Sequence, residues 1–579
     1  MVLLCVWMVA WSGASFKFSY MRFLNRLPRF LLPLISGGIL TLAFPGANFE
    51  LAAWLWLFPL LFLLWPIKSN ERAKTSSLFL SGWLAGAAFW IPNLAWLRHS
   101  SRVIAGARDD AWIGWESELL GAAAVVGLAL YCALYFGAWA WIVGRFAKPD
   151  FERLSKSRWQ ESTWVSLRSA FIAGAAWVGL EWVRSFLLFS GFGWNGLGVA
   201  LHQNDVLIQI TDVVGVMGLS FLPVFVACTA WNAIGRMICS YGHAERCRSR
   251  LDFTFALIVV LAVAGYGMQK LAGKRTEETM TVRTVLVQPN VAQVDAWSGE
   301  LGPQVYQRLS TFTRLYAEAR DGTTHTDLVI WPESALPVHL HGLPDHKPYF
   351  DELLALGDYS LLTGTELHEE GRQGHVSAVL FRDNYENRQE YNKIHLVAFG
   401  EYLPYRNIPP FSFLKGVLPG DFAPGTKAEP LLLEKPQVQL IPLICFEDTV
   451  GRLARRFVRP APQMLVNITN DGWFLESTET EVHLANAKFR AIELHRPMVR
   501  AANTGISCFI NAYGQITSRL SDPETGNTFI EGCLPGEVQV PKAGKLTFYA
   551  QWGDVFSIAM LLITGVVIAM SLLKKRQPV

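Results

Sequence analysis

Three predicted strands in the second half of the chain end on side chains suited to nucleophilic chemistry. Glu333 follows LVIWP, Lys393 lies within YNKIHL, and Cys445 follows LIPLI. Layered α/β folds place catalytic groups at strand ends. A thiolate is a strong nucleophile at neutral pH, a carboxylate can accept its proton, and an ammonium group can stabilise the thiolate and then an oxyanion. Together the three residues predict a cysteine nucleophile served by a Glu base and a Lys.

Neighbouring residues leave the details of this site open. Glu401 and Glu447 offer two further carboxylates that could orient Lys393. His395 is a rival activator of the thiol, because a regular strand would place it on the same face as Lys393. We favour Lys393. The eight cysteines form no Cys-x-x-Cys pair and no His/Cys cluster, so the sequence predicts neither a metal ion nor an organic cofactor.

The segment that carries these residues has the pattern of an α/β domain, with short β-rich runs alternating with helical periodicity. SAVLFRD and NRQEYNKIHL read as a hairpin pair, and VHLANAKFRAIELHR as one amphipathic helix. The other predicted strands are VRTVLVQPN, TDLVIWPES, YSLLTGTEL, VQLIPLICFED, QMLVNITNDGWF and ISCFINAYGQI.

The rest of the chain is too apolar for an ordinary soluble domain. Of its 579 residues 51% are hydrophobic and only 17% are charged, against roughly 25% charged in soluble domains. A spanning helix needs about 20 mainly apolar residues. We therefore predict eight spans, at 28–45, 51–67, 77–97, 118–144, 164–187, 207–235, 252–270 and 554–573.

Basic residues concentrate in alternate loops between these segments. Lys and Arg gather near 17–29, 68–74, 145–158, 236–250 and 574–576, whereas the loops at 45–50 and 190–205 carry none. The positive-inside rule then places both termini in the cytoplasm and residues 271–553 on the far side of the membrane. No dense basic stripe is present, so nucleic acid is not an expected partner. Residues 1–20 are an uncertain extension, because Met21 also reads as a start.

Two features of the apolar part allow more than one interpretation. Glu181 and Arg184 stand three residues apart on a predicted helix, as a structural ion pair or a functional intramembrane pair. The loop SGFGWNGLG, with Trp194, is either an interfacial turn or part of a lipid entry site.

A long irregular segment at 401–426 is rich in proline and large apolar residues. Loops of this length are often lids. We expect it to insert Phe411, Phe413, Leu414 and Leu418 into the lipid surface; the alternative is an inert cover over the core.

The motifs resemble those of a known superfamily. Glu333 in WPES, Lys393 in NKIHLVAFGEYLP and Cys445 in LICFED are similar to the Glu–Lys–Cys triad of the nitrilases. FGEYLPYR, ICFED, NITNDGWF and RAANTG, together with the membrane segments, resemble the apolipoprotein N-acyltransferases of Gram-negative bacteria. Phe446 and Gly193 depart from this family, which often has Tyr and Pro there.

The resemblance implies a fold with a polytopic helical membrane domain of about eight spanning helices and an αββα nitrilase-like sandwich. The corresponding units are a membrane domain with seven spans at 21–270, a periplasmic catalytic domain at 271–550, and a last span with a cytoplasmic tail at 551–579. The implied location is the bacterial inner membrane.

The resemblance also implies a reaction. A membrane phospholipid would acylate Cys445, and the thioester would acylate the N-terminal amine of a diacylglyceryl-modified lipoprotein. Lys393 and the Phe446 backbone N–H would stabilise the oxyanion, with Glu401 and Glu447 in support. Trp473 and Arg500 match family positions near the site, with core packing and a structural ion pair as their alternatives.

Two other functions remain open from the sequence. A membrane-tethered amidase would use the same three residues but pass the acyl group to water. A transporter or receptor with an inactive nitrilase-like domain would need no triad, so the presence of all three residue types favours an enzyme.

Overall fold

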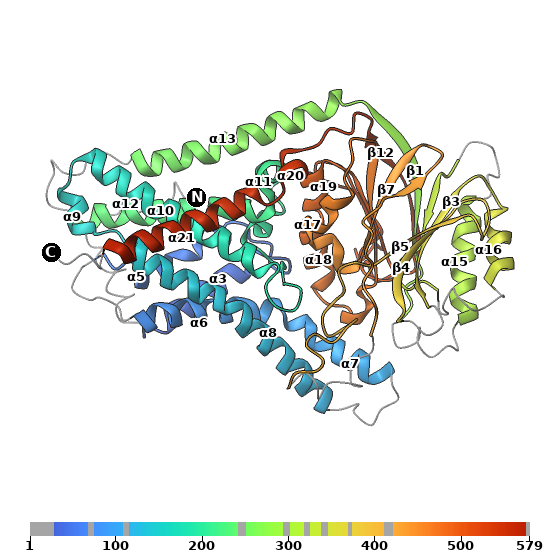
Figure 1. The fold of residues 1–579 in the computed structure, drawn as a ribbon, viewed down its shortest axis with the longest axis horizontal. Coiled ribbons are helices and arrows are strands. Elements are labelled where there is room, and N and C mark those ends of the chain that lie inside the picture. Colours follow the sequence, from blue (N-terminus) through green and yellow to red (C-terminus); the bar gives the residue numbers. More distant parts are fainter. Residues whose placement is uncertain are drawn as a thin grey trace.

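The chain forms a helical part and a sheet-rich part that lie end to end (Figure 1). The computed structural model describes residues 28–67, 75–107, 115–240, 251–292, 302–317, 325–336, 346–368, 373–409 and 421–574. Residues 1–20 lie outside this described part, as do residues 410–420 of the expected lid, with Phe411, Phe413, Leu414 and Leu418.

The helical part is built from long apolar helices that run roughly parallel to one another (Figure 1). Its helices are α3 (Leu31–Thr41), α4 (Ala52–Leu55), α5 (Leu57–Leu64), α6 (Thr75–Asn93), α7 (Arg98–Ala107), α8 (Trp115–Ile142), α9 (Phe151–Lys156), α10 (Trp159–Arg184), α11 (Thr211–Leu219), α12 (Phe221–Cys239), α13 (Leu251–Gly273) and α21 (Val555–Lys574). Short 3-10 turns lie at Ala95–Leu97, Leu197–Leu201 and Leu207–Ile210.

The expected count of eight spans is not confirmed. In the described residues four helices are long and apolar enough to cross a membrane: Trp115–Ala147, Phe221–Cys239, Leu251–Gly273 and Val555–Leu573. A fifth is possible if Ser76–Asn93 and Ala95–Val103, bent by 50°, count as one span. Leu31–Thr41 and Ala52–Leu64 are too short, and α10 carries several Ser, Glu and Arg side chains along its 26 residues. The four helices indicate a membrane protein.

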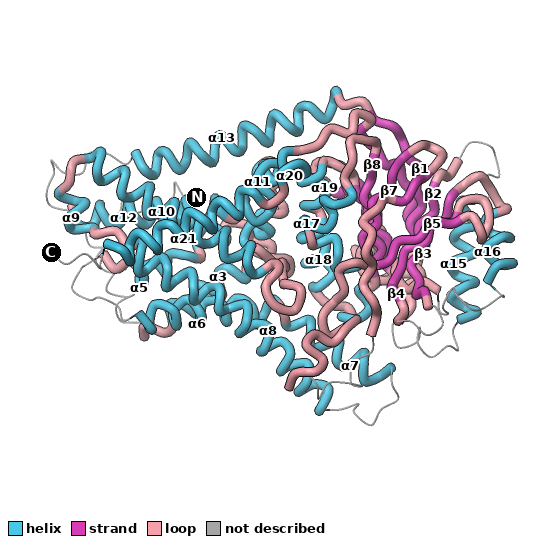
Figure 2. Tube along the Cα trace, viewed as in Figure 1, coloured by secondary structure: helices cyan, strands magenta, loops and turns pink. Residues whose placement is uncertain are grey.

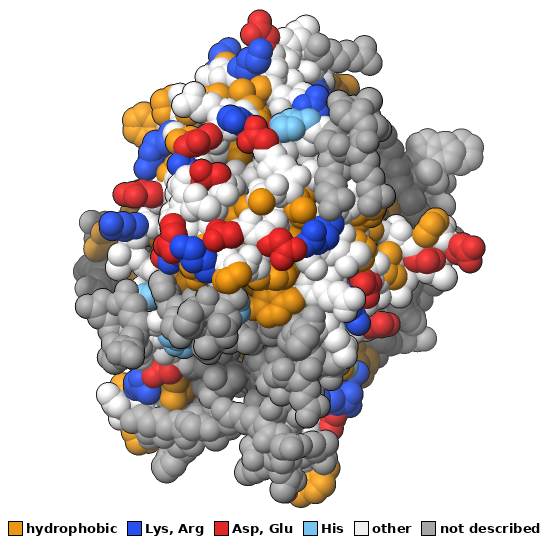
Figure 3. Space-filling model, turned by 90° about the vertical axis from the view of Figure 1, so that its right-hand side faces the viewer, with side chains coloured by type: hydrophobic (Ala, Val, Ile, Leu, Met, Phe, Trp, Pro, Cys, Tyr) orange, Lys and Arg blue, Asp and Glu red, His pale blue; other side chains and the backbone are white. Residues whose placement is uncertain are grey.

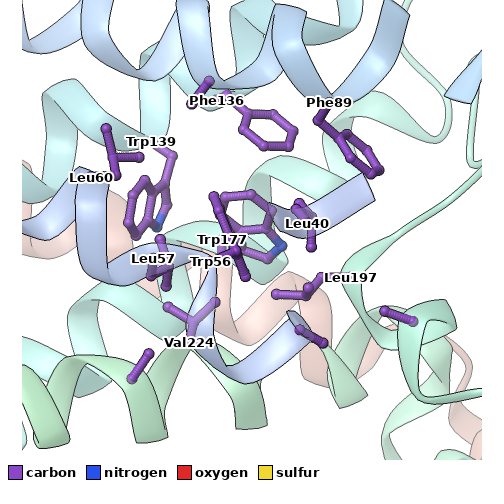
Figure 4. Close-up of a cluster of buried hydrophobic side chains, with 14 of the residues drawn as sticks. Leu40, Trp56, Leu57, Leu60, Phe89, Phe136, Trp139, Trp177, Leu197 and Val224 are labelled. Carbon is purple, nitrogen blue, oxygen red and sulfur yellow. The ribbon is translucent and has the colours of Figure 1, made fainter. Parts of the chain in front are cut away.

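Aromatic side chains fill the centre of the helical part (Figure 4). Trp177 packs edge-on against Trp56, Phe136 and Trp139, with ring centroids 5.1, 4.9 and 5.3 Å away. Such T-shaped pairs suit the quadrupoles of aromatic rings. Glycines let the surrounding helices approach, and a Cβ on Gly82 of α6 would lie 2.3 Å from the Phe136 carbonyl oxygen of α8.

The sheet-rich part contains two six-stranded sheets packed face to face between helices (Figure 2). One sheet has the order β12-β1-β2-β3-β4-β5 and the other β11-β10-β9-β8-β7-β6. The strands are β1 (Thr279–Gln288), β2 (Leu328–Ile330), β3 (Ser360–Leu367), β4 (His375–Phe381), β5 (Arg388–Asn392), β6 (Leu431–Leu433), β7 (Val438–Ile444), β8 (Gln463–Thr469), β9 (Met498–Ala502), β10 (Cys508–Ile510), β11 (Ile516–Arg519) and β12 (Gly532–Pro541).

Helices cover the outer faces of both sheets, which gives the four layers expected from the sequence. The first sheet packs on α15 (Gly302–Ala317) and α16 (His346–Leu354). The second packs on α17 (Gly451–Ala454), α18 (Glu479–Ala487) and α19 (Phe489–Leu494), which face the helical part (Figure 1). α20 (Phe548–Trp552) precedes α21. The face at the sheet end carries scattered acidic and basic side chains (Figure 3).

Strand β7 shows how the sequence produces this arrangement. It pairs in parallel with β8 and antiparallel with β6, which satisfies both its edges, and the other sheet and the helices cover its two faces, so its side chains are almost all buried. A continuous apolar run such as VQLIPLI is typical of such a strand. The hairpin of β4 with β5 is confirmed, whereas the single helix expected at 482–496 is divided into α18 and α19.

The close contact of α6 with α8 can be tested by adding one methyl group. Gly82→Ala is expected to lower the free energy of unfolding by about 1–3 kcal/mol, because its Cβ would overlap the α8 backbone. Gly265→Ala on α13 is the matched control, since no atom lies within 4 Å of its Cβ position. Thermal unfolding in detergent measures both. An unchanged melting temperature for Gly82→Ala would contradict this packing.

Candidate active site

Lys393 lies at the centre of the candidate site. Its ammonium group is fully buried and contacts two carboxylates, with Nζ 2.6 Å from Glu401 Oε1 and 3.3 Å from Glu333 Oε1. It follows directly after β5, and its backbone N–H donates to the Val376 carbonyl while its carbonyl accepts from Gly425 N–H. The backbone thus fixes the start of the side chain, and the two carboxylates fix its end.

Glu333 reaches this position because its loop lies directly on strand β3. After β2 the Trp331 N–H donates to Leu362 O, and the Gly364 N–H donates to Pro332 O at 3.1 Å. A Cβ on Gly364 would lie 2.6 Å from the Cα of Glu333, so only glycine permits this approach.

Cys445 lies at the end of β7, where the chain turns into a 3-10 helix, η7 (Cys445–Thr449). Its φ of 51° is unusual for a residue other than glycine. Asn467 of β8 holds the turn, since its Nδ2 donates to the carbonyls of Leu443 and Cys445, each at 3.2 Å. Strained backbone of this kind often marks a functional position, where its surroundings hold it in place.

The charges around the thiol set its resting state. Burial raises the pKa of Cys445 well above its ordinary value, and the Glu333 carboxylate adds to this effect while Lys393 opposes it. Burial also raises the pKa of Glu333, while the Lys393 ammonium, which donates to its carboxylate, and the Cys445 thiol act to lower that pKa. Burial lowers the pKa of Lys393, but Glu401 and Glu333 outweigh it and hold that pKa above its ordinary range. The site therefore holds a neutral thiol beside a base and an ammonium group.

Glu447 connects the turn of the nucleophile to the loop that carries Lys393. Its two carboxylate oxygens accept from the Tyr391 hydroxyl at 2.9 and 3.0 Å, from Ile394 and His395 N–H at 2.8 and 2.9 Å, and from Ile444 N–H at 2.9 Å. Tyr391, Ile394 and His395 lie next to Lys393 in the chain, and Ile444 directly precedes Cys445. Burial raises the pKa of Glu447 to about 7, although hydrogen bonds from His395 and Ile444 act against this rise.

Aromatic rings form one wall beside Cys445. The Phe446 ring stacks on Trp194 at 5.8 Å, on Phe192 at 6.3 Å and on the His395 ring at 5.9 Å. His395 therefore packs beside the site, while Lys393 makes the polar contacts. Trp194 is buried, so it contributes to the site as part of this wall.

The loop that carries Trp194 is held by the two charged residues on α10. Glu181 Oε1 accepts from the Leu197 N–H at 2.7 Å and from the Trp177 indole at 2.8 Å. Arg184 Nη1 donates to the carbonyls of Phe192 and Trp194, at 2.7 and 2.8 Å. This geometry favours a structural role for Glu181 and Arg184, which hold the loop at 192–197 against α10.

Arg500 is buried beneath the nucleophile turn. Its guanidinium donates to Asp448 Oδ2 and Asn467 Oδ1, each at 2.8 Å, and to Asp471 Oδ2 at 3.1 Å. With no exposed surface, Arg500 fits the structural ion pair better than a substrate contact. Trp473 lies with Asp471 in a 3-10 turn, Asp471–Phe474, and is partly exposed.

Three buried side chains in this region lie close enough together to hold a metal ion: Asp471, Glu479 and His483. The Arg500 guanidinium, however, lies 2.9 Å from His483 Nδ1 and 3.1 Å from Asp471 Oδ2. A positive charge thus already balances these carboxylates, so we assign no metal to this cluster.

The structure brings together Glu333, Lys393, Cys445, Glu401 and Glu447, from segments that lie far apart in the sequence. Phe446 and Trp194 pack together beside them. Sequence reasoning assigned no role to Tyr391, Asn467, Asp448 and His483, although the first three lie within the motifs YNKIHL, NITNDGWF and ICFED. The bonds Tyr391–Glu447, Asn467–Cys445, Asp448–Arg500 and His483–Asp448 join residues 22 to 56 positions apart, so no local pattern reveals them.

Comparison with known proteins identifies both parts of the chain. The apolipoprotein N-acyltransferase N-terminal domain family matches residues 36–229, and the carbon-nitrogen hydrolase family matches residues 291–539. The chain is 30% identical to the apolipoprotein N-acyltransferase of Geobacter metallireducens, over 95% of this chain and 97% of that one. It is 30% identical to that of Rhodopseudomonas palustris, over 95% and 96%. A carbon-nitrogen hydrolase structure from Helicobacter pylori is 15% identical, with a TM-score of 0.33, over 51% and 95%.

The sheet-rich part is thus a carbon-nitrogen hydrolase domain, with Cys445 at the end of strand β7. The whole chain belongs to the apolipoprotein N-acyltransferase family, and it is an acyltransferase.

The role of Glu447 can be tested by an isosteric change. Glu447→Gln replaces an acceptor oxygen by an NH₂ group that faces an N–H donor, so both loops should shift. We expect kcat to fall on the order of 100-fold, the effect of a misplacement of about 1 Å. Glu390→Gln on β5 is the matched control, because Glu390 is exposed and its carboxylate pairs with Arg388 on the same strand. Equal activity of the two variants would contradict a positioning role.

The resting state of the thiol gives a pH prediction. Because the pKa of Cys445 is raised, the thiol is neutral at pH 7 and its alkylation rate should still increase above pH 8.5, about the pKa of a free cysteine. Intact mass after timed exposure to iodoacetamide measures this rate, with Cys445→Ala as the blank. A rate that reaches its plateau below pH 7 would show a resting thiolate instead.

Proposed function

We propose that this acyltransferase moves an acyl chain from a membrane phospholipid to the N-terminal amine of a diacylglyceryl-modified lipoprotein. Family membership supports lipoprotein N-acylation. The observation that carries the mechanism is the buried ion pair of Lys393 with Glu333, whose charges both act on the pKa of the Cys445 thiol.

In the first step Glu333 takes the proton of Cys445 as the sulfur attacks the sn-1 ester carbonyl. A C–S bond forms and the ester C–O bond breaks. Glu333 returns the proton to the leaving alkoxide, and a lysophospholipid departs. Cys445 then carries the acyl chain as a thioester. A neutral thiol beside a carboxylate suits this step, since the base acts only when the ester has bound.

In the second step the amine of the acceptor attacks the thioester. A C–N bond forms, the C–S bond breaks, and the nitrogen loses a proton while the Cys445 sulfur regains one through Glu333. The product is an amide, and the enzyme is ready for another cycle. Both steps pass through a tetrahedral oxyanion, which Lys393 and the Phe446 backbone N–H would stabilise. Glu401 keeps Lys393 oriented between the two steps.

A membrane location suits this reaction, because both substrates are anchored lipids. We propose a membrane domain within residues 21–270, a periplasmic catalytic domain at 271–550 and a last span with a cytoplasmic tail at 551–579. The alternating basic loops support this orientation. The direct connection of α13 to β1 and of α20 to α21 supports the boundaries.

A labelled acyl chain distinguishes this function from its alternatives. The purified protein is incubated with vesicles of a phospholipid labelled in its sn-1 chain and with a diacylglyceryl lipopeptide. We expect the label on the peptide amine, as a mass gain of one acyl chain. The same lipopeptide with an acetylated amine is the matched control and should gain nothing. Release of labelled fatty acid alone would instead identify a hydrolase, and no movement of label an inactive domain.

A further inference from the structure

The loop at 186–191, which follows α10, has an unusual backbone. Leu188, Phe189 and Ser190 have φ values of 58°, 50° and 67°, in the left-handed region that residues other than glycine seldom adopt. Each such residue is energetically unfavourable, so the surroundings must hold three in succession.

Both parts of the chain hold this loop. Arg452, which follows the nucleophile turn, donates to the Ser185 carbonyl at 2.7 Å and to the Ser190 carbonyl at 3.3 Å. The Tyr131 hydroxyl of α8 donates to the Leu187 carbonyl at 2.7 Å. The strained loop is thus fixed between the helical part and the carbon-nitrogen hydrolase domain.

The fixed loop contacts the turn that contains Glu401. The Phe189 ring lies 5.4 Å from the Phe399 ring and 5.8 Å from the Tyr405 ring. The Ser190 Oγ lies 2.6 Å from the Tyr402 hydroxyl, within hydrogen-bonding distance. Phe399 and Tyr402 are on either side of Glu401, so these contacts bracket it.

The Glu401 turn is a small structure of its own. The Phe399 N–H donates to the Tyr402 carbonyl at 2.8 Å, and Phe399 has a φ of 65°. The Glu401 carboxylate accepts from the Val397 N–H at 2.7 Å and from Lys393 at 2.6 Å. A shift of this turn would therefore move the carboxylate away from Lys393.

We propose that Phe189 and Ser190 are positioning residues, through which the helical part holds Glu401 against Lys393. This inference rests on the proposed roles of Lys393 and Cys445. The 186–191 loop would then affect the reaction, although neither Phe189 nor Ser190 belongs to the carbon-nitrogen hydrolase domain. The link runs from the loop to the Glu401 turn and from Glu401 to the ammonium group beside the thiol.

A double-mutant cycle tests this link, with Phe189→Ala, Glu401→Gln and the double variant in the full-length protein. A residue that acts through Glu401 has no further effect once Glu401 is lost, whereas an independent structural residue adds its own. Leu188→Ala is the matched control, because its side chain is 43% exposed and takes no part in the proposed contacts.

Two readouts are used for every variant. One is the rate of Cys445 alkylation by iodoacetamide, which needs no acyl-transfer activity. The other is acyl transfer to the lipopeptide, resolved into kcat and KM. If no acyl transfer occurs in the wild-type protein, the proposed function fails, and the alkylation cycle still decides the positioning role.

We expect Phe189→Ala and Glu401→Gln to change the alkylation rate in the same direction and to lower kcat, each about tenfold or more. In both the alkylation rate and kcat, the double variant should match the single variant that differs more from the wild type. Leu188→Ala should match the wild type. Effects of the single variants that multiply in the double variant would overturn the proposal. So would an unchanged rate in Phe189→Ala.

Discussion

The site depends on one buried ammonium group between two carboxylates. A lone charge away from water is costly, and a lysine with no exposed surface requires partners that are themselves fixed. Lys393 has them in Glu401, at 2.6 Å, and Glu333, at 3.3 Å. Because Glu333 and the Cys445 thiol also influence each other's pKa, the charge balance of the site and the proposed proton transfer at sulfur involve the same cluster.

This cluster requires three loops from two sheets to meet within a few ångströms. Glu333 and Lys393 come from the first sheet and Cys445 from the second. Glu447 joins the second sheet to the Lys393 loop through backbone N–H groups on both sides. The helical part completes the enclosure through the stack of Trp194 on Phe446 and through the 186–191 loop. The loops of the helical part therefore contribute to the surroundings of the candidate site.

Several of these features could be predicted from the sequence because their signals are local. The run before Cys445 is apolar throughout, since β7 is covered on both faces, and it leads directly to the nucleophile. Strand β12 gave no such signal, because its exposed edge side chains and its glycine and proline interrupt the pattern. The pairing of Arg500 with Asp448, 52 residues apart, is invisible in any window of sequence. The count of eight spans is not confirmed, because helices such as α3 and α5 are as apolar as membrane helices but shorter.

The central claim is that Cys445 carries the acyl chain between donor and acceptor. The most direct measurement is the intact mass of the purified protein after incubation with phosphatidylethanolamine vesicles and no acceptor, beside Cys445→Ala. The account predicts a gain of one acyl chain that hydroxylamine removes and that the variant lacks. A folded, lipid-bound wild-type protein without this adduct, or an equal adduct on Cys445→Ala, would contradict it.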